Sequence, residues 1–574
     1  MKHKGKSHNN KASNSALSNI WMYAPPIILT FIVYFPTISH GFVDWDDPQM
    51  LLGNIFVRDL SFEGIKNIFT GFVNDNYHPF TVLSYAIEYN FVQYAPKLYH
   101  FDNVLLHCIN VLLVFLLIHK LTGKIWVAVI TSALFGIHPM HVESVAWVTE
   151  RKDVLFTLFY LIGLKYYLDF IDEKSSFTKK YWLVFLFFVL SVLSKAQAVT
   201  FPVILLLFDW FKQRKFDKQV ILEKLPFFAL SLVLGLITLS AAKSAGTIVY
   251  VEQYTIFERF LFGCYSLIVY LVKIVAPFSL SAIYPYPKEI EGSYPMLIYA
   301  SPVLVLGILV LLWRSFKLSL NYVVFGLMFF IINIFLFLQL IPVGHAFIAD
   351  RFAYVPFIGI YFVIGYKLSS IIEGHSTKAK SLKNIVIPLT LVFVFMLCYV
   401  NWNRSKAWKD SEALWLDVTA KYPNMALAHN HLGSVYMNSQ YDKALKHFNK
   451  CIKLDSQYKY AINNRGIVYY NQGKYGKALL DFHKAIEIDP GFSLAIHNRG
   501  AVYKVKGSPD KAMDDYNKAI ELNPTYAQAY YSRSTMFTEQ KRYKEALADA
   551  LKAQELGYNI DTKYLDDLRR QVAQ

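Results

Sequence analysis

The chain has 574 residues, of which 55% are hydrophobic and 17% charged, and its formal net charge is +16. Soluble proteins of this length rarely combine so much apolar residue with so little charge, so the composition indicates a membrane protein. The basic residues fall in short loops between apolar runs and form no face interleaved with base-stacking aromatic residues, so we expect no nucleic-acid binding.

Residues 1–20 are rich in lysine and are expected to form a basic cytoplasmic tail. The apolar run that begins at Trp21 is followed by no small-residue cleavage signal, so we expect a retained signal anchor. Eleven apolar segments are predicted to span the membrane: 21–40, 101–119, 124–138, 153–170, 181–194, 197–211, 220–241, 297–313, 319–341, 353–371 and 384–400.

The segment 258–278 is also apolar, but counting it as a span would place the basic run 378–383 outside the membrane. We therefore expect it to be interfacial or re-entrant. The resulting prediction is an all-α polytopic helix bundle of about eleven spans over residues 21–405, with its basic loops in the cytoplasm. The remainder of the chain then lies outside.

A 34-residue repeat begins after residue 411. Alanines recur at this spacing in two registers, one of which is Ala444, Ala478, Ala512 and Ala546. This is the period of tetratricopeptide helix pairs, in which small residues let neighbouring helices approach. We predict an α-solenoid of about four repeats over residues 411–574, with 411–422 as an additional packing helix.

The first external loop, about 41–100, contains adjacent carboxylates at Asp46 and Asp47. A carboxylate at the outer lip of a membrane suits an enzyme that moves a sugar from a lipid phosphate to a hydroxyl, because it can accept the hydroxyl proton. The alternative is a solvated turn in which aspartate caps a helix.

The second external loop contains His138, His141 and Glu143. Spacings of three and two do not place all three side chains on one helix face, so the pattern does not favour a metal site over an ordinary loop. No cofactor is firmly implied, and a divalent metal is the lesser alternative.

Three cations, Arg151, Lys152 and Arg351, fall at the predicted membrane edge, where a lipid phosphate would sit. Arginine can hold phosphate oxygens with two parallel hydrogen bonds. The alternative is that these cations extend to the membrane surface or form ion pairs with Asp153 or Asp350.

Four ordered motifs resemble the transmembrane and tetratricopeptide-repeat family of O-mannosyltransferases and, more distantly, the protein O-mannosyltransferases and the GT-C glycosyltransferase fold. The motifs are Trp45-Asp-Asp, Tyr77-His-Pro-Phe-Thr, His138-Pro-Met-His-Val-Glu-Ser-Val with Glu150-Arg-Lys-Asp, and Ala349-Asp-Arg-Phe-Ala-Tyr-Val-Pro356. The resemblance covers nearly the whole chain, with the membrane half before the repeats.

The resemblance implies that Asp46 or Asp47 is the general base, and Asp46 matches the first acid of the family's pair. It also implies a polyprenyl-phosphate sugar donor, inversion at the anomeric carbon and no nucleotide sugar. Two departures matter: the second acid is aspartate where glutamate is common, and His78 stands where relatives often have arginine. The phosphate role of this position is therefore in doubt. The other active-site candidates are His78, His138, His141, Glu143, Asp153 and Asp350.

The repeats are expected to form a groove that holds a peptide or glycan acceptor. The alternative is that its polar side chains only face solvent. The residues expected to face this groove are Asn430, Asn463, Tyr470, His497, Lys504 and Tyr531.

We therefore predict an integral-membrane glycosyltransferase that moves a sugar, mannose by the family's example, from a polyprenyl phosphate to a protein hydroxyl. The alternatives are a non-catalytic membrane-anchored scaffold for envelope proteins and a transferase acting on lipid or polymer glycans. The lysine-, asparagine- and phenylalanine-rich composition favours a bacterial inner membrane, or the endoplasmic reticulum if the source is eukaryotic. The repeats would then lie on the periplasmic or lumenal side.

Overall fold

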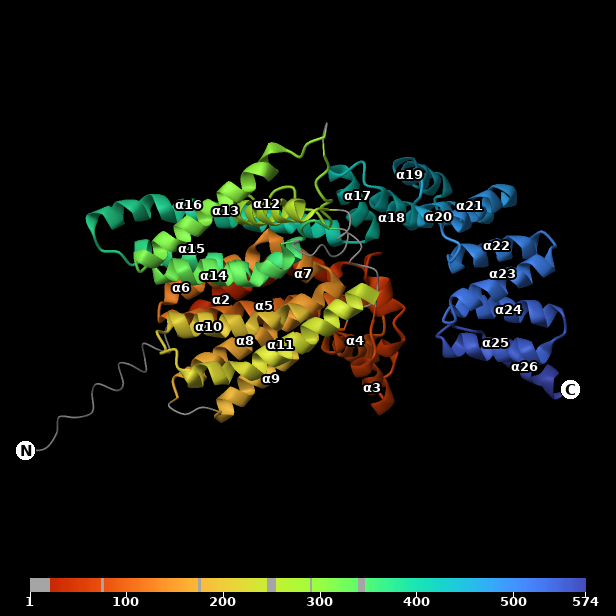
Figure 1. Cartoon of the computed structure of the whole chain (residues 1–574), viewed down its shortest axis with the longest axis horizontal. Helices are drawn as coiled ribbons and strands as arrows, with labels where there is room; N and C mark the ends of the chain where they lie inside the picture. Colours follow the sequence, from red (N-terminus) through yellow and green to blue (C-terminus); the bar gives the residue numbers. More distant parts are fainter. Residues whose placement is uncertain (1–20, 74–76, 174–176, 245–253, 290–291, 339–345) are drawn as a thin grey trace, which may run out of the picture. The chain divides into compact units, whose positions relative to one another are not determined.

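The computed structural model describes residues 21–73, 77–173, 177–244, 254–289, 292–338 and 346–574, and every regular element in these ranges is a helix (Figure 1). The predicted all-α class is confirmed. The chain divides into two compact units, Met1–Leu414 and Trp415–Gln574. The predicted cytoplasmic tail, 1–20, lies outside the described residues.

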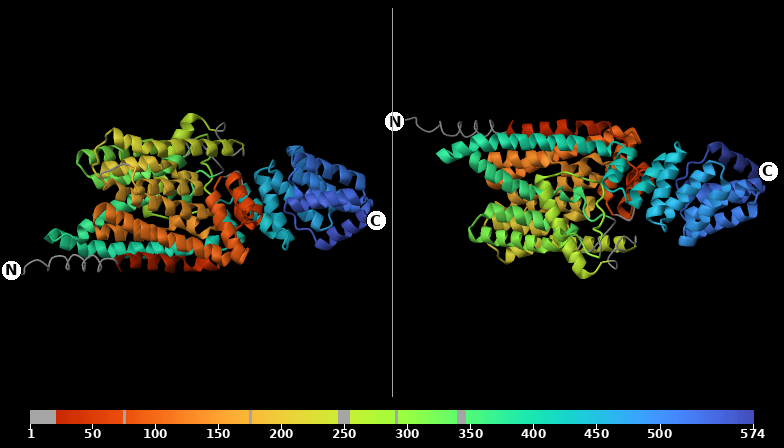
Figure 2. Two further views of the ribbon diagram at one scale, coloured as in Figure 1. Left: turned by 90° about the horizontal axis from the view of Figure 1, so that it is seen from below. Right: turned by 90° about the horizontal axis from the view of Figure 1, so that it is seen from above.

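The α-helices of the first unit form a bundle whose long members run alongside one another (Figure 2). Their bounds are α2 Ala24–Tyr34, α3 Phe62–Thr70, α4 Pro79–Val92, α5 Pro96–Thr122, α6 Ile125–Ile137, α7 Val142–Ala146, α8 Arg151–Ile171, α9 Lys179–Ser194, α10 Phe201–Phe211, α11 Lys218–Ser244, α12 Ile256–Val275, α13 Met296–Lys317, α14 Asn321–Ile334, α15 Phe357–Ile372 and α16 Thr377–Ser405.

Six helical stretches in the described residues are long and apolar enough to cross a membrane. They coincide with six of the eleven predicted spans and are Trp21–Ser39, Pro96–Thr122, Val148–Ile171, Lys218–Ser240, Met296–Lys317 and Lys380–Trp408. A seventh candidate is the pair Ile125–Ile137 and Pro139–Ala146, bent by 55°.

The other four predicted spans overlap shorter apolar helices: α9, the segment Ala196–Phe211, the segment Asn321–Phe337 and α15. A straight helix needs about 20 residues to cross the hydrocarbon core, so length does not support these four. A count of eleven therefore stays a prediction. The segment 258–278 forms α12, and its interfacial position is likewise still a prediction.

Glycine lets two of the shorter helices touch at their backbones. A Cβ atom on Gly326 of α14 would overlap the carbonyl oxygen of Gly359 on α15, and the reverse also holds. Small residues at helix crossings are the usual means of close packing within a membrane. The short helices α14 and α15 are thus packed closely against each other.

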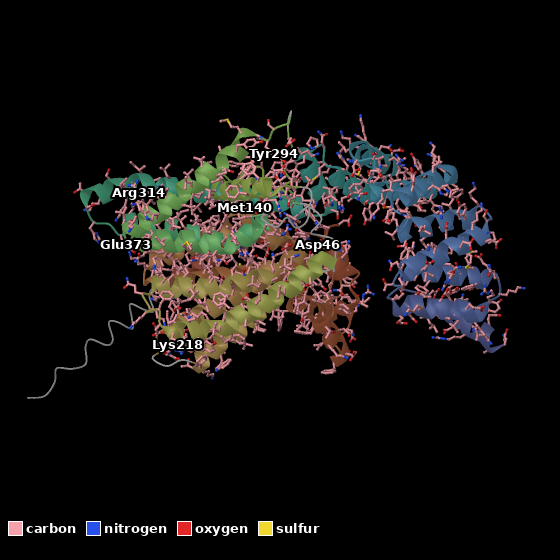
Figure 3. The ribbon with its side chains drawn as sticks, in the orientation of Figure 1. Asp46, Met140, Lys218, Tyr294, Arg314 and Glu373 are labelled. Atoms are coloured by element: carbon pink, nitrogen blue, oxygen red, sulfur yellow. The ribbon has the colours of Figure 1, made fainter. Side chains whose placement is uncertain are left out.

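Asp46 and the basic residues that the sequence assigns to the cytoplasm lie at different ends of the bundle. Figure 3 places Asp46 and Tyr294 towards one end, and Lys218, Arg314 and Glu373 towards the other. Lys218 begins α11 and Arg314 lies in the last turn of α13, both beside basic loops that the sequence assigns to the cytoplasm. Asp46 therefore lies at the end of the bundle remote from these two basic residues.

The second unit contains the predicted repeats as four helix pairs. These are α18 Ala426–Tyr436 with α19 Tyr441–Leu454, α20 Lys459–Asn471 with α21 Tyr475–Ile488, α22 Ser493–Val505 with α23 Pro509–Leu522, and α24 Ala527–Glu539 with α25 Tyr543–Glu555. The helix α17, Ser411–Lys421, precedes them and α26, Thr562–Ala573, follows. In the last three pairs an arginine of the first helix makes a two-pronged ion pair with an aspartate of the second: Arg465–Asp481, Arg499–Asp515 and Arg533–Asp549.

Replacing Gly466 with alanine should destabilise the repeats by about 1–3 kcal/mol, because the added Cβ would lie 2.7 Å from the buried ring of Phe482. Gly476 is the matched control, since a Cβ there meets nothing within 4 Å and alanine favours the helix. Thermal unfolding of both variants checks the expectation. Equal melting temperatures for the two would show that the helices do not approach at Gly466.

Candidate active site

Asp47 is buried at the start of the loop that follows α2. Its carboxylate accepts hydrogen bonds from the Val43 backbone NH (2.8 Å), the Thr149 hydroxyl (2.8 Å) and the Trp147 indole NH (3.0 Å). Burial outweighs these three donors and raises its pKa to about 6. Asp47 closes a turn at Val43 and connects this loop to the segment that precedes α8. Because it is buried and makes no helix-capping hydrogen bond through its side chain, the alternative of a solvated, helix-capping aspartate does not describe it.

Asp46 is in a different position. Its side chain is 26% exposed, and the nearest cation is the Lys152 ammonium, with 3.8 Å between Nζ and Oδ2. An accessible carboxylate beside a cation is available to a substrate, whereas Asp47 is fully hydrogen-bonded. Of the two predicted bases, the geometry favours Asp46.

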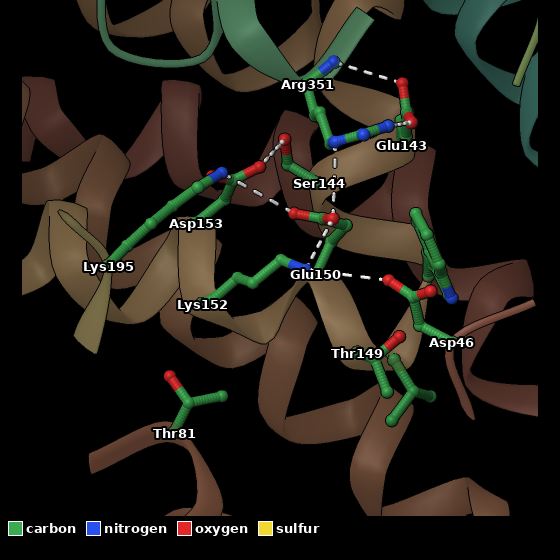
Figure 4. Close-up of polar contacts among 12 residues, drawn as sticks. Asp46, Thr81, Glu143, Ser144, Thr149, Glu150, Lys152, Asp153, Lys195 and Arg351 are labelled. Atoms are coloured by element: carbon green, nitrogen blue, oxygen red, sulfur yellow. Dashed lines mark hydrogen bonds and ion pairs between the residues drawn. The ribbon is translucent and has the colours of Figure 1, made fainter. Parts of the chain in front are cut away.

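Glu150, at the end of the short helix η6 (Val148–Glu150), lies at the centre of a charged cluster (Figure 4). Its carboxylate is 3.0 Å from Lys152 Nζ, 3.3 Å from Arg351 Nε and 3.7 Å from Lys195 Nζ. Glu150 is 1% exposed, so three cations from three separate segments converge on one buried acid. Such a costly arrangement inside a membrane domain marks a functional site more often than a structural one.

Two further acids complete the cluster. Glu143 of α7 pairs with the Arg351 guanidinium and accepts the Arg351 backbone NH (3.1 Å). Asp153 of α8 pairs with Lys195 and accepts a hydrogen bond from Ser144 (2.9 Å). The cations are thus held in place by carboxylates but keep some access, with Lys152, Lys195 and Arg351 side chains 12%, 11% and 18% exposed.

The indole ring of Trp147 is an aromatic platform on which this site rests. Its ring stacks on Trp408 with centroids 5.1 Å apart and packs against Trp45 at 5.3 Å. The same ring faces the Lys152 ammonium and the Arg351 guanidinium, at 5.9 and 5.8 Å from its centroid. One aromatic platform therefore supports both the loop that carries Asp46 and two of the cations.

Arg151 lies apart from the cluster, although it was predicted to bind phosphate. Its guanidinium pairs with Glu88 and donates to Asn103 Oδ1 (2.8 Å) and to the Tyr99 carbonyl (2.7 Å). Successive helical residues point in different directions, so Arg151 is buried against α4 and α5 while its neighbour Lys152 reaches the site. Arg151 is no longer a phosphate candidate.

Asp350 is also separate from its neighbour Arg351. It accepts the Tyr284 hydroxyl (2.6 Å), and the Arg404 guanidinium is 4.0 Å away. The alternative that Arg351 pairs with Asp350 is replaced by the pairs that Arg351 makes with Glu143 and Glu150.

The two histidines of the second loop are buried and bonded to backbone. His138 Nε2 donates to the Ile274 carbonyl (3.1 Å), and His141 Nδ1 donates to the Phe135 carbonyl (2.8 Å). Glu143 faces Arg351 instead of these rings. In the described part of the chain, no three histidine, cysteine or acidic side chains are arranged to hold a metal ion.

His78, which precedes α4, is buried close to Lys152 and Lys195. Burial and these two ammonium groups lower its pKa to about 3. A neutral imidazole cannot replace the charge of an arginine, so we do not assign it the phosphate role of its position in the resembling family.

His78 should make the protein less stable in mild acid. The pKa of His78 is about 3 in the folded protein and 6.5 ordinarily, so below pH 6.5 the imidazole takes up a proton in the unfolded chain but stays neutral in the folded chain. Protonation therefore favours the unfolded chain, and the loss of folding stability grows as the pH falls. Between pH 7 and pH 5, wild type should lose about 2 kcal/mol more stability than His78→Gln. Unfolding midpoints in detergent at both pH values measure this, and equal losses would contradict it.

Sequence reasoning did not assign roles to Glu150 or Lys195. Glu150 was inside the quoted run Glu150-Arg-Lys-Asp, and Lys195 lies between two short apolar runs at the same predicted membrane face. A charged residue flanked by apolar segments was the available signal, but only the fold shows that the two side chains meet.

The predicted groove residues lie on the first helices of the repeats, and several of them join neighbouring repeats. Asn464 donates to Asn430 (3.3 Å), Asn498 donates to Asn463 (2.9 Å), and His497 bonds to Ser532 (2.9 Å). The remaining three make other contacts: Tyr470 packs on Tyr475, Lys504 pairs with Glu539 (2.9 Å), and Tyr531 stacks on Tyr558. Asn430, Asn463 and His497 are buried.

Family models for the tetratricopeptide repeat match residues 426–458, 460–492, 493–526 and 515–548. The predicted repeats are thereby confirmed. Among solved structures, MamA is similar at 24% identity over 25% of this chain and 86% of that chain, with a TM-score of 0.23. A tetratricopeptide protein of Thermus thermophilus is 19% identical over 32% of this chain and 95% of that chain, with a TM-score of 0.26.

Curated relatives extend the similarity into the membrane unit. The chain is 31% identical to the protein O-mannosyl-transferase Tmtc2 of Drosophila melanogaster over 32% of this chain and 21% of that protein. It is 26% identical to the protein O-mannosyl-transferase F38B6.6 of Caenorhabditis elegans over 75% of this chain and 62% of the relative. The human protein O-mannosyl-transferase TMTC1 is 22% identical over 68% of this chain and 49% of its own length.

The chain is similar to the TMTC proteins. It combines apolar helices with tetratricopeptide repeats, and a relative carrying the O-mannosyl-transferase name is similar over three quarters of it. The chain spans less than two thirds of the length of these curated relatives.

Proposed function

We propose that the chain is an integral-membrane glycosyltransferase of GT-C type that transfers a sugar, mannose by its relatives' names, from a polyprenyl phosphate to a protein hydroxyl. The observation that carries the proposal is the charged cluster beside Asp46. There an accessible carboxylate lies next to cations that converge on Glu150 at the end of the bundle remote from Lys218 and Arg314.

The donor phosphate would be held by Lys152, Arg351 and Lys195. All three keep some exposure, and all three face Glu150. A phosphate that enters would share them with Glu150, and its growing negative charge would be offset as the sugar departs. Arginine matches two phosphate oxygens at once, so Arg351 would fix the phosphate's orientation.

Asp46 would accept the proton of the acceptor hydroxyl. The hydroxyl oxygen then forms the new bond to the anomeric carbon while the bond to the phosphate oxygen breaks, and the lipid phosphate leaves with that electron pair. A single displacement of this kind inverts the anomeric configuration. The donor in this step is the lipid-phosphate sugar, so no nucleotide sugar takes part.

The acceptor would be a protein segment captured by the repeats. Tetratricopeptide arrays use the surface formed by their first helices for binding, and Tyr470, Lys504 and Tyr531 carry a hydroxyl or an ammonium there. Tethering a bound acceptor to the membrane unit would raise its effective concentration at Asp46. The repeats would then lie on the periplasmic or lumenal side, in a bacterial inner membrane or the endoplasmic reticulum.

The proposal is tested by the release of polyprenyl phosphate from a panel of polyprenyl-phosphate sugars, offered to the purified full-length protein with and without an extract of secreted proteins. We expect release from one donor, and only with acceptor present. If polyprenyl phosphate were released when a glycolipid is added, and the secreted-protein extract made no difference, the result would favour a transferase acting on lipid glycans. No release from any donor would favour the membrane-anchored scaffold.

A further inference from the structure

The segment Lys406–Ser411, here called the junction, follows the last long helix of the membrane unit and contacts the loop that carries Asp46. The Gly41 NH donates to the Lys409 carbonyl (2.8 Å), and the Asp44 NH donates to the Ser411 hydroxyl (2.8 Å). Asp44 and Ser411 are 367 residues apart in the sequence, and both belong to the first unit. The Asp46 loop, near the N-terminal end of the first unit in sequence, is therefore anchored by residues near the C-terminal end of that unit.

The Ser411 hydroxyl is free for this contact because a neighbour caps its helix. Ser411 is the first residue of α17, and the residue before it, Asp410, occupies the N-cap position, where a side-chain oxygen commonly accepts a backbone NH of the helix. Here Asp410 does this, accepting the Ala413 NH at 2.8 Å. Asp410 thus caps α17, and Ser411 accepts the Asp44 NH of the Asp46 loop.

Trp408 makes the second contact of the junction with the site. It is fully buried and stacks on Trp147 at an interplanar angle of 21°. Trp147 in turn donates to Asp47 and supports Trp45, the residue before Asp46. The position of the Trp147 ring, and with it both carboxylates of the pair, depends on the ring behind it.

We propose that Trp408 and Ser411 are positioning residues for the transfer reaction, an inference that rests on the proposed function. Neither side chain lies among the reacting groups. Ser411 fixes the turn over Asp44 that leads to Asp46, and Trp408 fixes the platform under the cations. A base displaced by a fraction of an ångström loses much of its rate, so Ser411 would set kcat while leaving substrate binding unchanged.

The test compares three full-length variants: Ser411→Ala, Ser411→Thr and Thr419→Ala. Thr419 is the matched control, since its hydroxyl lies in the same helix, α17, and bonds only to carbonyls of that helix at Trp415 and Leu416. Amide hydrogen exchange of the segment 41–47 is measured by mass spectrometry without substrate. The kcat and KM of sugar transfer are measured in parallel.

For Ser411→Ala we expect amide exchange of the segment 41–47 to accelerate and kcat to fall by about tenfold with KM unchanged. Ser411→Thr, which keeps the hydroxyl, should restore both, and Thr419→Ala should match wild type. Unchanged exchange and unchanged kcat in Ser411→Ala would overturn the inference. If wild type transfers no sugar, the proposed function fails, but faster exchange in Ser411→Ala alone would still establish the anchoring.

Discussion

Replacing Asp46 with asparagine should lower kcat for sugar transfer by about 10²–10⁴, the contribution usual for a positioned general base. Asparagine keeps the shape of the side chain but cannot accept the hydroxyl proton. Because Asp46 is partly exposed and its nearest cation is 3.8 Å away, the change should leave folding almost intact. Initial rates of polyprenyl-phosphate release measure the effect.

Two comparisons isolate the role of Asp46. Asp59→Asn is the matched control, because Asp59 lies in the same segment between α2 and α5 and its carboxylate contacts Ser61. It should retain wild-type kcat. Asp47→Asn should instead weaken the turn at Val43 and the contacts with Trp147 and Thr149, and so reduce thermal stability as well as rate. A wild-type kcat in Asp46→Asn would remove Asp46 as the base.

The second large effect is expected at the Glu143–Arg351 pair. Arg351→Gln leaves Glu143 buried without its guanidinium, and breaking a buried pair in this way costs about 3–5 kcal/mol. The same substitution removes the group that we assign to the donor phosphate. The single variant should therefore lose both stability and donor binding.

A double variant separates the two losses. In Glu143→Gln with Arg351→Gln the isolated buried charge is gone, so most of the thermal stability should return. Donor binding should not return, and the KM for the polyprenyl-phosphate sugar should stay raised by at least about tenfold, as expected for a lost charged hydrogen bond. Recovery of the donor KM along with stability would show that Arg351 acts only through the fold.

The repeats and the helical membrane unit were predictable because their signals are local. A period of 34 residues, marked by Ala444, Ala478, Ala512 and Ala546, identifies helix pairs without knowledge of the tertiary structure. The count of eleven spans depends on hydropathy and on the placement of basic residues, and neither signal fixes the length of each helix. The helix α9, with 16 residues, is apolar but short, and hydropathy does not distinguish a span from a helix packed inside the bundle.

The division of roles between adjacent residues could not be predicted. Asp46 and Asp47 have the same chemistry, and their roles differ because Trp147 and Thr149, about a hundred residues away, bind one of them. Arg151 and Lys152 differ for the same reason: Glu88 and Asn103 hold the first inside the fold, and the second reaches Glu150. Contacts across the fold, which spacing does not encode, decide such cases.

Transfer of a sugar to protein with Asp46 as base is best tested by analysing the glycosylated product. Purified wild type, Asp46→Asn and Asp59→Asn would each be incubated with a polyprenyl-phosphate mannose and acceptor protein, and the acceptor peptides analysed by mass spectrometry. We predict a hexose on serine or threonine hydroxyls with wild type and Asp59→Asn, and none above background with Asp46→Asn. Equal modification by wild type and Asp46→Asn, or no modification by any of the three, would contradict the account.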